Sequence, residues 1–365
     1  MSESQSPSID IFCRVIDNFG DAGVMWRLAR AMRALGYRIR LIIDDPQTLT
    51  FLAGVNHLSP VEKIGEKEGI DVLCWEKAWD NGPCPLTPAD VVIEGFACRL
   101  PADYENRMQK RPPKWFNIDY FSAEDWIEKC HLVPSIDPAS GLVKINYFPG
   151  ITSRSGSLVI EKNYEDKQRS FLDLHPKKAS PLSIFFFGYP YGPINEIASV
   201  FKALGSPLEL HLSQCEASRL LGESEAIKTA PWISVKNLPF TAQKDFDELL
   251  WGSDIAFVRG EDSAARAMIA GIPFIWHIYH QDDDVHMVKL KALEARLKPY
   301  FEEESVYGLW CLLQESYNEG HFDRELFKAL VVHLPQWKKA SESFARDLRS
   351  LGSLSDKLSE LIKNG

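Results

Sequence analysis

The sequence predicts an α/β protein of two successive domains, each built on a sheet of parallel strands. Three observations support this class. The chain has 365 residues, and two domains are expected because domains usually hold ~100–200 residues. Hydrophobic residues make up 45% and charged residues 25% of the chain, as in proteins with substantial cores. Short apolar runs alternate with helical patterns in both halves, which is typical of parallel sheets covered by helices.

The first apolar run opens a strand, helix, strand unit. Residues 9–16 are rich in apolar and β-branched side chains and predict a buried strand. A loop with two glycines follows over residues 17–23, then a helix over 24–35 and a second strand over 37–43. This order predicts parallel strands joined by a right-handed crossover.

Further strands complete a first domain, which is expected to run over residues 1–150. They are predicted at residues 90–93, 114–118, 131–134 and 142–148. Residues 151–180 are expected to connect the domains, because this stretch is rich first in Ser and Gly and then in charge. A short helix is predicted inside it, over residues 164–172.

The second domain is expected to comprise residues 181–365, with a regular alternation of elements followed by helices. Strands are predicted at residues 182–187, 208–212, 232–235, 254–258 and 272–276. Helices are predicted at residues 195–204, 213–221, 243–251 and 262–270. From residue 285 onward the pattern is helical, and residues 334–363 are predicted to form one long amphipathic terminal helix.

Charge and cysteine usage exclude several classes of partner and environment. The formal net charge is −10, so no general attraction to nucleic acid or to an anionic membrane is expected. Seven cysteines lie without a CxxC pair, which favours reduced thiols in a reducing compartment. Residues 1–7 lack an apolar signal core, and no apolar run approaches the ~20 residues that span a bilayer. A cytoplasmic protein is predicted.

The segment from Arg259 to Ser263 is the strongest candidate for binding an anion. It follows a predicted strand and opens a predicted helix, and ligands of open α/β sheets bind at the carboxyl ends of strands. Free backbone N–H groups and the helix dipole favour a phosphate there. Arg259 can add a bidentate contact and Glu261 can hold ribose hydroxyls. The alternative stays open that Asp262 or Ser263 caps the helix and that Arg259 pairs with Glu261.

The loop after the first strand carries a second candidate site. Asp17 and Asp21 flank a turn at Gly20, and such a pair can supply a general base. The alternative is a turn former followed by a helix cap. A dinucleotide site with Asp44 on the ribose is a further alternative, but G-x-G-x-x-G is absent and the two aspartates would repel a pyrophosphate.

Four residues are candidates for contacting a nucleotide base, because each lies at or just after the end of a second-domain strand. They are Phe186, Tyr189, Phe240 and Gln243. Core packing is the alternative, and it is the stronger interpretation for Phe186. No metal site is predicted, since residues 282–284 and the histidines nearby lack metal-ligand spacing.

Four motifs resemble the EarP family of bacterial protein-arginine rhamnosyltransferases, which modify translation elongation factor P. They are IFCRVIDNFGDAGVMWRLAR at 11–30, FFFGYP at 185–190, LPFTAQKDFDELLW at 238–251 and FVRGEDSAARAMIAGIPFIW at 257–276. The resemblance implies a GT-B glycosyltransferase with two Rossmann-like domains facing a cleft. It implies transfer of rhamnose from dTDP-β-L-rhamnose to one arginine of elongation factor P with inversion, which helps ribosomes stalled on consecutive prolines.

The resemblance also implies roles for individual residues. Phe240 and Gln243 would bind thymine, and Asp262 and Ser263 would hold the diphosphate. Arg259 and Tyr189 would lie nearby, and the acidic residues important for activity would be Asp17, Asp21 and Glu261. Further donor contacts are expected from Asn18, Phe19, Gly20 and Phe186.

Of the acidic pair, Asp21 is hypothesised to be the general base and Asp17 to align the acceptor arginine. No cofactor or metal is expected besides the donor substrate. Loops such as Asp119-Tyr120-Phe121 are candidates for recognising elongation factor P. The alternatives are a transferase with another nucleotide sugar or acceptor, and a nucleotide-binding regulatory module without catalysis.

Overall fold

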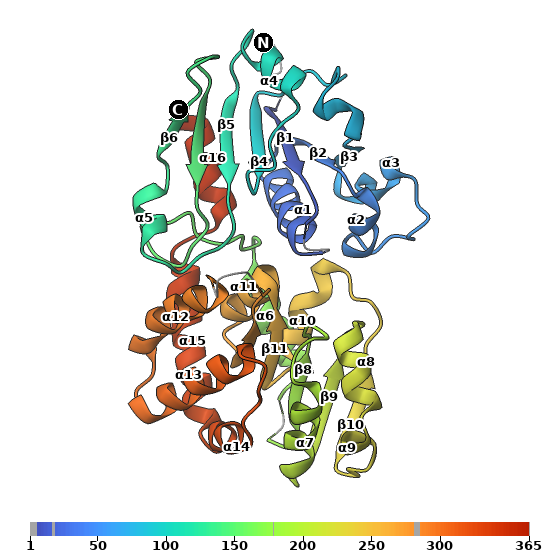
Figure 1. The fold of residues 1–365 in the computed structure, drawn as a ribbon, viewed down its shortest axis with the longest axis vertical. Coiled ribbons are helices and arrows are strands. Elements are labelled where there is room, and N and C mark those ends of the chain that lie inside the picture. The colour runs from blue at the N-terminus through green and yellow to red at the C-terminus, as the bar shows by residue number, and fades with distance from the viewer. Residues whose placement is uncertain (1–5, 17–18, 178, 281–284, 365) are drawn as a thin grey trace. The chain divides into compact units, whose positions relative to one another are not determined.

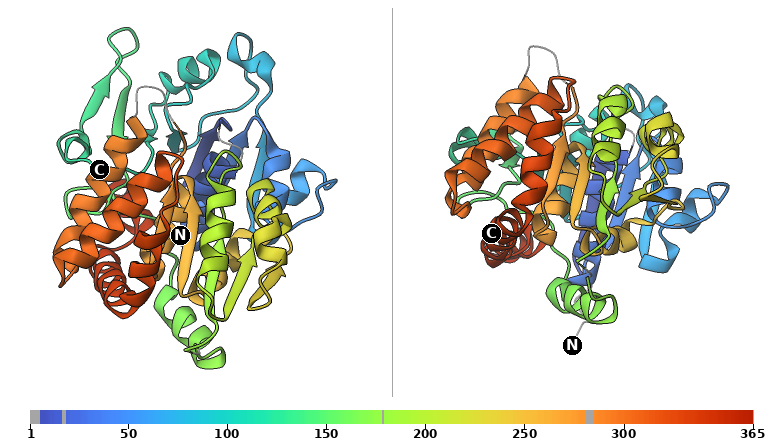
Figure 2. Two further views of the ribbon diagram at one scale, coloured as in Figure 1. Left: turned by 60° about the horizontal axis from the view of Figure 1, so that its bottom comes forward. Right: turned by 90° about the horizontal axis from the view of Figure 1, so that it is seen from below.

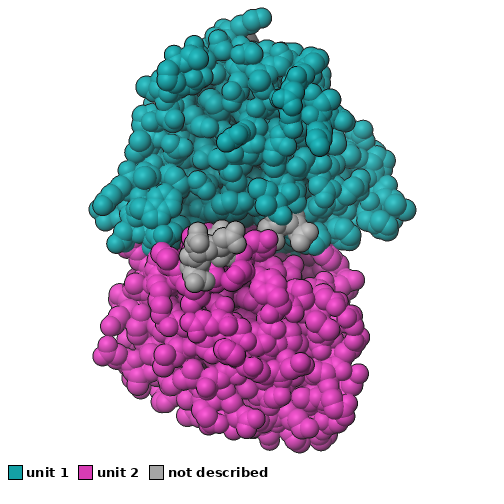
Figure 3. Space-filling view, in the orientation of Figure 1, with its two compact units in different colours: residues 1–162, 242–244, 351–365 teal, residues 163–241, 245–350 magenta. Residues whose placement is uncertain are grey.

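The computed structural model describes residues 6–16, 19–177, 179–280 and 285–364, and the chain divides into two units (Figure 3). The first comprises Met1–Lys162, Ala242–Lys244 and Leu351–Gly365, and the second comprises Asn163–Thr241 and Asp245–Ser350. This division differs from the expected one, in which residues 181–365 formed a single second domain. The C-terminal residues and a short segment around Gln243 belong instead to the first unit.

The first unit is an α/β domain with one sheet (Figure 1). Its elements are β1 (Ser8–Cys13), α1 (Phe19–Ala34), β2 (Arg38–Ile43), α2 (Pro46–Leu52), α3 (Val61–Ile64), β3 (Ile70–Cys74), β4 (Val91–Gly95), α4 (Ala102–Met108), β5 (Lys114–Ile118), α5 (Trp126–Cys130), β6 (Pro134–Ile136), β7 (Val143–Tyr147) and α16 (Leu354–Asn364).

The strands of the first sheet lie in the order β3-β2-β1-β4-β5-β7-β6. All neighbours pair in parallel except β6, which is an antiparallel edge strand on β7. The strand predicted at residues 131–134 is wrong. Residues 131–133 form a turn, and β6 starts only at Pro134, a residue that an edge strand tolerates because it needs no ladder N–H.

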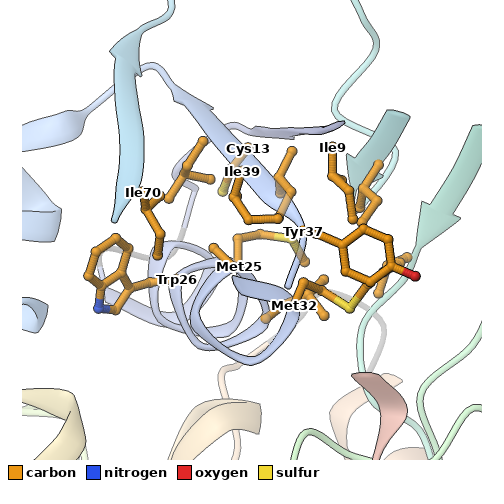
Figure 4. Close-up of a cluster of buried hydrophobic side chains, with 14 of the residues drawn as sticks. Ile9, Cys13, Met25, Trp26, Met32, Tyr37, Ile39 and Ile70 are labelled. Carbon is orange, nitrogen blue, oxygen red and sulfur yellow. The ribbon is translucent and has the colours of Figure 1, made fainter. Parts of the chain in front are cut away.

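Helix α1 and the terminal helix α16 cover the same face of this sheet. Figure 4 shows Met25, Trp26 and Met32 of α1 beside apolar side chains of β1, β2 and β3. Leu354, Leu358 and Ile362 of α16 belong to this core as well. The opposite face has its own buried cluster around Phe12, Trp75 and Tyr104. Burial on both faces explains why β1 and β2 read as nearly continuous apolar runs.

The second unit is also an α/β domain. Its elements are α6 (Tyr164–Leu174), β8 (Leu182–Phe186), α7 (Ile194–Ala203), β9 (Leu208–Leu212), α8 (Glu216–Glu223), α9 (Glu225–Lys228), β10 (Ile233–Asn237), α10 (Phe246–Trp251), β11 (Ile255–Arg259), α11 (Gly260–Ala270), β12 (Phe274–His277), α12 (Val285–Leu297), α13 (Glu304–Asn318), α14 (Arg324–Val332) and α15 (Leu334–Ser350). The five strands are all parallel, in the order β10-β9-β8-β11-β12.

Aromatic packing joins the second sheet to its helices. The ring of Phe257 on β11 contacts Phe186 on β8, Phe201 on α7, and Phe327 on α14, with centroid separations of 5.3, 5.8 and 6.3 Å. Helices α12 to α15, orange to red, gather beside the β12 edge of this sheet, and α7 to α9 lie beside its other strands (Figures 1 and 2). Large buried rings such as these dominate the energetics of a core.

The predicted single terminal helix is wrong in one respect, because the chain breaks after Ser350. Gly352 adopts a φ of 80°, in the left-handed region that ends helices. The hydroxyl of Ser157 donates to the carbonyl of Gly352 over 2.5 Å, and Leu354 N–H donates to the carbonyl of Leu158 over 2.8 Å. The break therefore directs α16 onto the first unit. In the described part of the chain, no helix combines the length and apolarity needed to cross a membrane.

Candidate functional site

Each sheet contains one point at which the strand order reverses direction. In the first sheet the order runs outward from β1 on one side and from β4 on the other, and in the second it does so from β8 and β11. Ligands of open α/β sheets bind outside the carboxyl ends of the strands at such switch points. The predicted segments fall there: the loop after β1 in the first unit, and Tyr189 and Arg259 in the second.

Arg259 is held at the second switch point by three contacts. Its Nη1 donates to the carbonyl of Gly188 over 3.1 Å. Its guanidinium carbon lies 4.3 Å from the ring centroid of Phe187 and 4.8 Å from that of Tyr189. A guanidinium over aromatic faces is stabilised by the ring quadrupoles. The side chain stays half-buried, so this arrangement presents a pre-oriented cation that suits a phosphate group.

The N-terminus of α11 lies directly after Arg259. Gly260 has a φ of 60°, which turns the chain from β11 into the helix, and its carbonyl accepts the indole N–H of Trp276 over 2.7 Å. Ser263 Oγ accepts the N–H of Arg259 over 2.9 Å and donates to the Arg259 carbonyl. Ser263 thus bonds to the backbone of Arg259, the residue that precedes the helix, as a capping side chain would. A ligand that used the Ser263 hydroxyl would have to replace this contact.

The acidic residues of this segment lie in the first turn of α11. Glu261 pairs with Lys289 of α12 at 3.2 Å, and both side chains are largely buried. The sequence left open a pairing of Arg259 with Glu261, whereas the structure pairs Arg259 with the carbonyl of Gly188 and Glu261 with Lys289. Asp262 occupies the same first turn, where its charge is favourable to the helix dipole.

Tyr189 is fixed by its neighbours at the end of β8. Its N–H donates to Nδ1 of His277 over 3.3 Å, and its ring stacks on that of Tyr191 at a centroid distance of 5.1 Å. Burial, followed by the charge of Arg259 and by His286, lowers the pKa of His277 to about 3. His277 is therefore neutral near neutral pH, and it orients Tyr189 without adding a second cation beside Arg259.

The three other candidates for the nucleotide base differ in environment. Phe186 is fully buried and packs on Phe257, so its assignment to donor binding is corrected: the ring has no exposed face on which a base could stack. Phe240 is 36% exposed in the loop after β10. Gln243 is buried within the first unit, where its Nε2 donates to the Gly23 carbonyl over 2.6 Å. Of the three, Phe240 is the exposed one.

Asp21 is the acidic residue that the structure places at the first switch point. It lies in the first turn of α1 and is 1% exposed. Its two oxygens accept the N–H of Ile16 over 2.7 Å and the hydroxyl of Tyr120 over 2.8 Å. Asp21 is thus not a helix cap, because α1 starts two residues earlier, at Phe19. Asp17 and Asn18 lie outside the described residues.

Phe19 and Gly20, which the sequence placed in the first loop, lie in the first turn of α1. The ring of Phe19 meets that of Phe51 edge to face at 5.7 Å. Asp44, the ribose ligand in the dinucleotide alternative, accepts the N–H of Val15 over 2.9 Å. It therefore shapes the loop that precedes Asp21.

Two thiols lie beside the first switch point without being nucleophiles. Burial, and then the neighbouring Cys98, raises the pKa of Cys13 at the end of β1. Burial likewise raises the pKa of Cys98, whose thiol donates to the carbonyl of Phe12 over 3.6 Å. Both stay protonated near neutral pH, so neither thiol is an activated nucleophile.

Comparison with known structures places this fold among glycosyltransferases. MurG of Acinetobacter baumannii aligns with a TM-score of 0.53 at 12% identity over 99% of this chain and 100% of that one. The structure that explains EarP-mediated arginine glycosylation of translation elongation factor EF-P aligns with a TM-score of 0.62 at 24% identity, over 99% and 100%. The two Rossmann-like units therefore have the fold of the GT-B class.

Sequence comparison then identifies the family. The family described as Elongation-Factor P (EF-P) rhamnosyltransferase EarP matches residues 9–363, and the chain belongs to it. A protein-arginine rhamnosyltransferase of Pseudomonas putida is 36% identical over 356 residues, which cover 90% of this chain and 91% of the relative. The resemblance that the motifs suggested is therefore confirmed over nearly the whole sequence.

Structure adds contacts that sequence patterns did not predict. Phe187 and Gly188 hold Arg259, and His277 orients Tyr189. Tyr120, which the sequence offered only as part of a loop that recognises elongation factor P, holds Asp21. No local pattern could have found these contacts, because Tyr189 and His277 are 88 positions apart and Asp21 and Tyr120 are 99 apart. Their only shared signal is a position just after or at the end of a predicted strand.

Proposed function

We propose that this protein transfers L-rhamnose from dTDP-β-L-rhamnose to an arginine side chain of elongation factor P, with inversion at the sugar carbon. The modified factor would then support translation of consecutive prolines. The observation that carries the proposal is Arg259, pre-oriented by three contacts beside the N-terminus of α11 at the second switch point. Family membership names rhamnose and elongation factor P as the substrates to test first.

The second unit is proposed to hold the donor. Its diphosphate would lie at the N-terminus of α11, where Asp262 and Ser263 occupy the first turn and Arg259 supplies the fixed positive charge. Phe240 has the exposed ring that stacking on thymine requires. Gln243 belongs to the first unit, so its role toward the base remains a prediction of the family resemblance, and its amide would first have to give up its contact with Gly23.

The first unit is proposed to activate the acceptor. A guanidinium has a pKa above about 12, so the arginine is protonated and a poor nucleophile until it loses a proton. Asp21 would take a proton from the attacking nitrogen as the C–N bond forms and the bond from C1 to the phosphate oxygen breaks. Asp17 would align the guanidinium, and Glu261 would contact the sugar or its ribose from α11.

Leaving-group stabilisation follows from the charges at α11. The departing nucleoside diphosphate gains negative charge, which the helix dipole and Arg259 would stabilise without a metal ion. In-line attack by the arginine nitrogen in a single displacement inverts the configuration at C1. We expect no covalent glycosyl-enzyme intermediate, since the carboxylates act on the acceptor and on donor hydroxyls.

Intact-mass spectrometry of elongation factor P tests this function. Incubation with the protein and dTDP-L-rhamnose is expected to add one deoxyhexose, located on an arginine by fragmentation. Parallel reactions with UDP-sugars and with an Arg-to-Lys acceptor should give no adduct. If the acceptor stays unmodified while UDP-sugars are consumed, the protein uses another donor or acceptor.

A further inference from the structure

The carboxylate of Asp21 is oriented by two donors that approach different oxygens. The N–H of Ile16 donates to Oδ2 over 2.7 Å, and the hydroxyl of Tyr120 donates to Oδ1 over 2.8 Å. Asp21 itself is 1% exposed. Because one donor is a backbone group and the other a phenol, the plane of the carboxylate is fixed by two unrelated segments of the first unit.

Tyr120 is in turn held by the loop after β4. Its ring stacks on Phe96 with centroids 4.2 Å apart and planes 15° apart. The chain around it is anchored to β7, since Asp119 N–H donates to the Tyr147 carbonyl over 3.0 Å. The phenol therefore has little freedom to leave Asp21.

The loop that carries Phe96 adopts an unusual backbone. Phe96, Ala97 and Arg99 have φ values of 55°, 51° and 58°, in the left-handed region that residues other than glycine rarely adopt. Such backbone persists only where surrounding contacts determine it, and it clusters at functional sites.

Hydrogen bonds to buried groups of the first unit hold the backbone of this loop. Phe96 N–H donates to the Ile118 carbonyl over 2.8 Å. Ala97 N–H donates to Asn117 Oδ1 over 2.9 Å, and Arg99 N–H donates to Glu94 Oε1 over 2.8 Å. Glu94 and Asn117 are both buried, so they are fixed acceptors. The strained loop is thus built to present the Phe96 ring to Tyr120.

We propose that Tyr120 is a positioning residue for the general base, and that Phe96 supports it by stacking. The inference rests on the proposed function, in which Asp21 accepts the proton of the acceptor arginine. With Tyr120 on Oδ1 and the backbone on Oδ2, the remaining lone pairs of the carboxylate point in defined directions. Loss of the phenol would let the carboxylate rotate away from the orientation that the reaction requires.

Tyr120→Phe tests the inference, because it keeps the ring that stacks on Phe96 and removes only the hydroxyl. We expect kcat for rhamnosyl transfer to fall about 10-fold or more, with KM for the donor and the affinity for dTDP nearly unchanged. Phe96→Leu should give a smaller fall in kcat, because it removes the stack and keeps the phenol.

Tyr300→Phe is the matched control. The hydroxyl of Tyr300 also donates to a carboxylate, that of Asp347 over 3.1 Å, but on the exposed surface of the second unit. This variant should turn over like the unmodified protein.

Asp21→Asn separates the inference from the function on which it rests. If Asp21→Asn is inactive and Tyr120→Phe keeps its kcat, the positioning role is wrong and the proposed base stands. If Tyr120→Phe loses dTDP affinity in parallel with kcat, its role is structural and the inference is wrong. Full activity of Asp21→Asn would overturn the proposed base and the inference together.

Discussion

The guanidinium carbon of Arg259 lies 4.8 Å from the centroid of the Tyr189 ring, at the point where the second sheet reverses its strand order. Arg259 is the last residue of β11 and Tyr189 follows β8, and these two strands pair in parallel. Their contact joins the cation to an aromatic ring that itself packs edge to face against His277. A lysine could keep the charge at this position, but it lacks the planar guanidinium that stacks on aromatic rings and binds a phosphate through two N–H groups.

Arg259→Lys is therefore expected to weaken donor binding. We predict an increase of about 10-fold or more in the Kd for dTDP, because the bidentate contact and the cation–π stacking are lost while the charge stays. Isothermal titration with dTDP measures this. Arg219→Lys is the control, because Arg219 is exposed on α8 and pairs there with Glu216 and Glu223. Equal affinities of the two variants would remove Arg259 from the donor site.

Chelation of divalent cations is predicted to leave transfer intact. The helix N-terminus and Arg259 supply the positive charge that stabilises the leaving diphosphate in the proposed reaction. Initial rates with excess EDTA should equal those with added Mg²⁺. A strict requirement for Mg²⁺ would contradict this mechanism.

Glu294 is expected to make stability depend on pH. Burial raises its pKa to about 7, Lys291 opposes this and Glu315 adds to it, and its Oε1 has no partner among the described residues. Because the folded pKa exceeds the ordinary value of 4.5, the stabilisation from its protonated form is complete below about pH 4.5. It is lost as the pH rises through about 7.

Glu294→Gln should consequently stabilise the protein at about pH 8 by up to about 3 kcal/mol and have little effect near pH 4. Urea unfolding at the two pH values measures the difference. Glu302→Gln, an exposed residue that pairs with Lys339, should show no such pH dependence. A gain that is equal at both pH values would indicate that burial of the charge is not its cause.

The docking of α16 gives a prediction about stability. Leu358 is fully buried in the core of the first unit, together with residues of α1 and β1. Leu358→Ala should reduce the free energy of unfolding of that unit by about 2–5 kcal/mol. Val332→Ala, at a position that is 75% exposed, should change it by less than about 0.5 kcal/mol. If Leu358→Ala is as stable as the control, α16 does not stabilise the first unit.

The sequence predicted the second sheet better than the first. Strands at 182–187, 208–212 and 254–258 were predicted within about one residue, because each is a short apolar run that ends at a polar or Gly-bearing loop. The first helix starts at Phe19 rather than at residue 24, because Gly20 and Gly23 suggested a loop although α1 tolerates both. The short strand β3 was not predicted, because the exposed Asp71 interrupts its apolar run.

The candidate site was predictable only where it is local. Arg259 to Ser263 and the loop before Asp21 could be found from the sequence, because strand, loop and helix are consecutive there. The contacts that orient Asp21 could not, because they depend on the register of β4 and β5 and on a left-handed backbone at Phe96. An amphipathic pattern likewise shows that α16 has an apolar face but not which core receives it.

In the proposed reaction the second unit binds the donor and Asp21 of the first unit accepts the proton of the acceptor. Titration with dTDP and turnover of Asp21→Asn test these two roles together. We predict that this variant binds dTDP with an affinity within about two-fold of the unmodified protein and transfers no measurable rhamnose. Asp71→Asn, an exposed carboxylate of the same sheet, should bind and transfer normally. Near-normal transfer by Asp21→Asn, accompanied by loss of transfer in Asp17→Asn, would show that Asp21 is not the base.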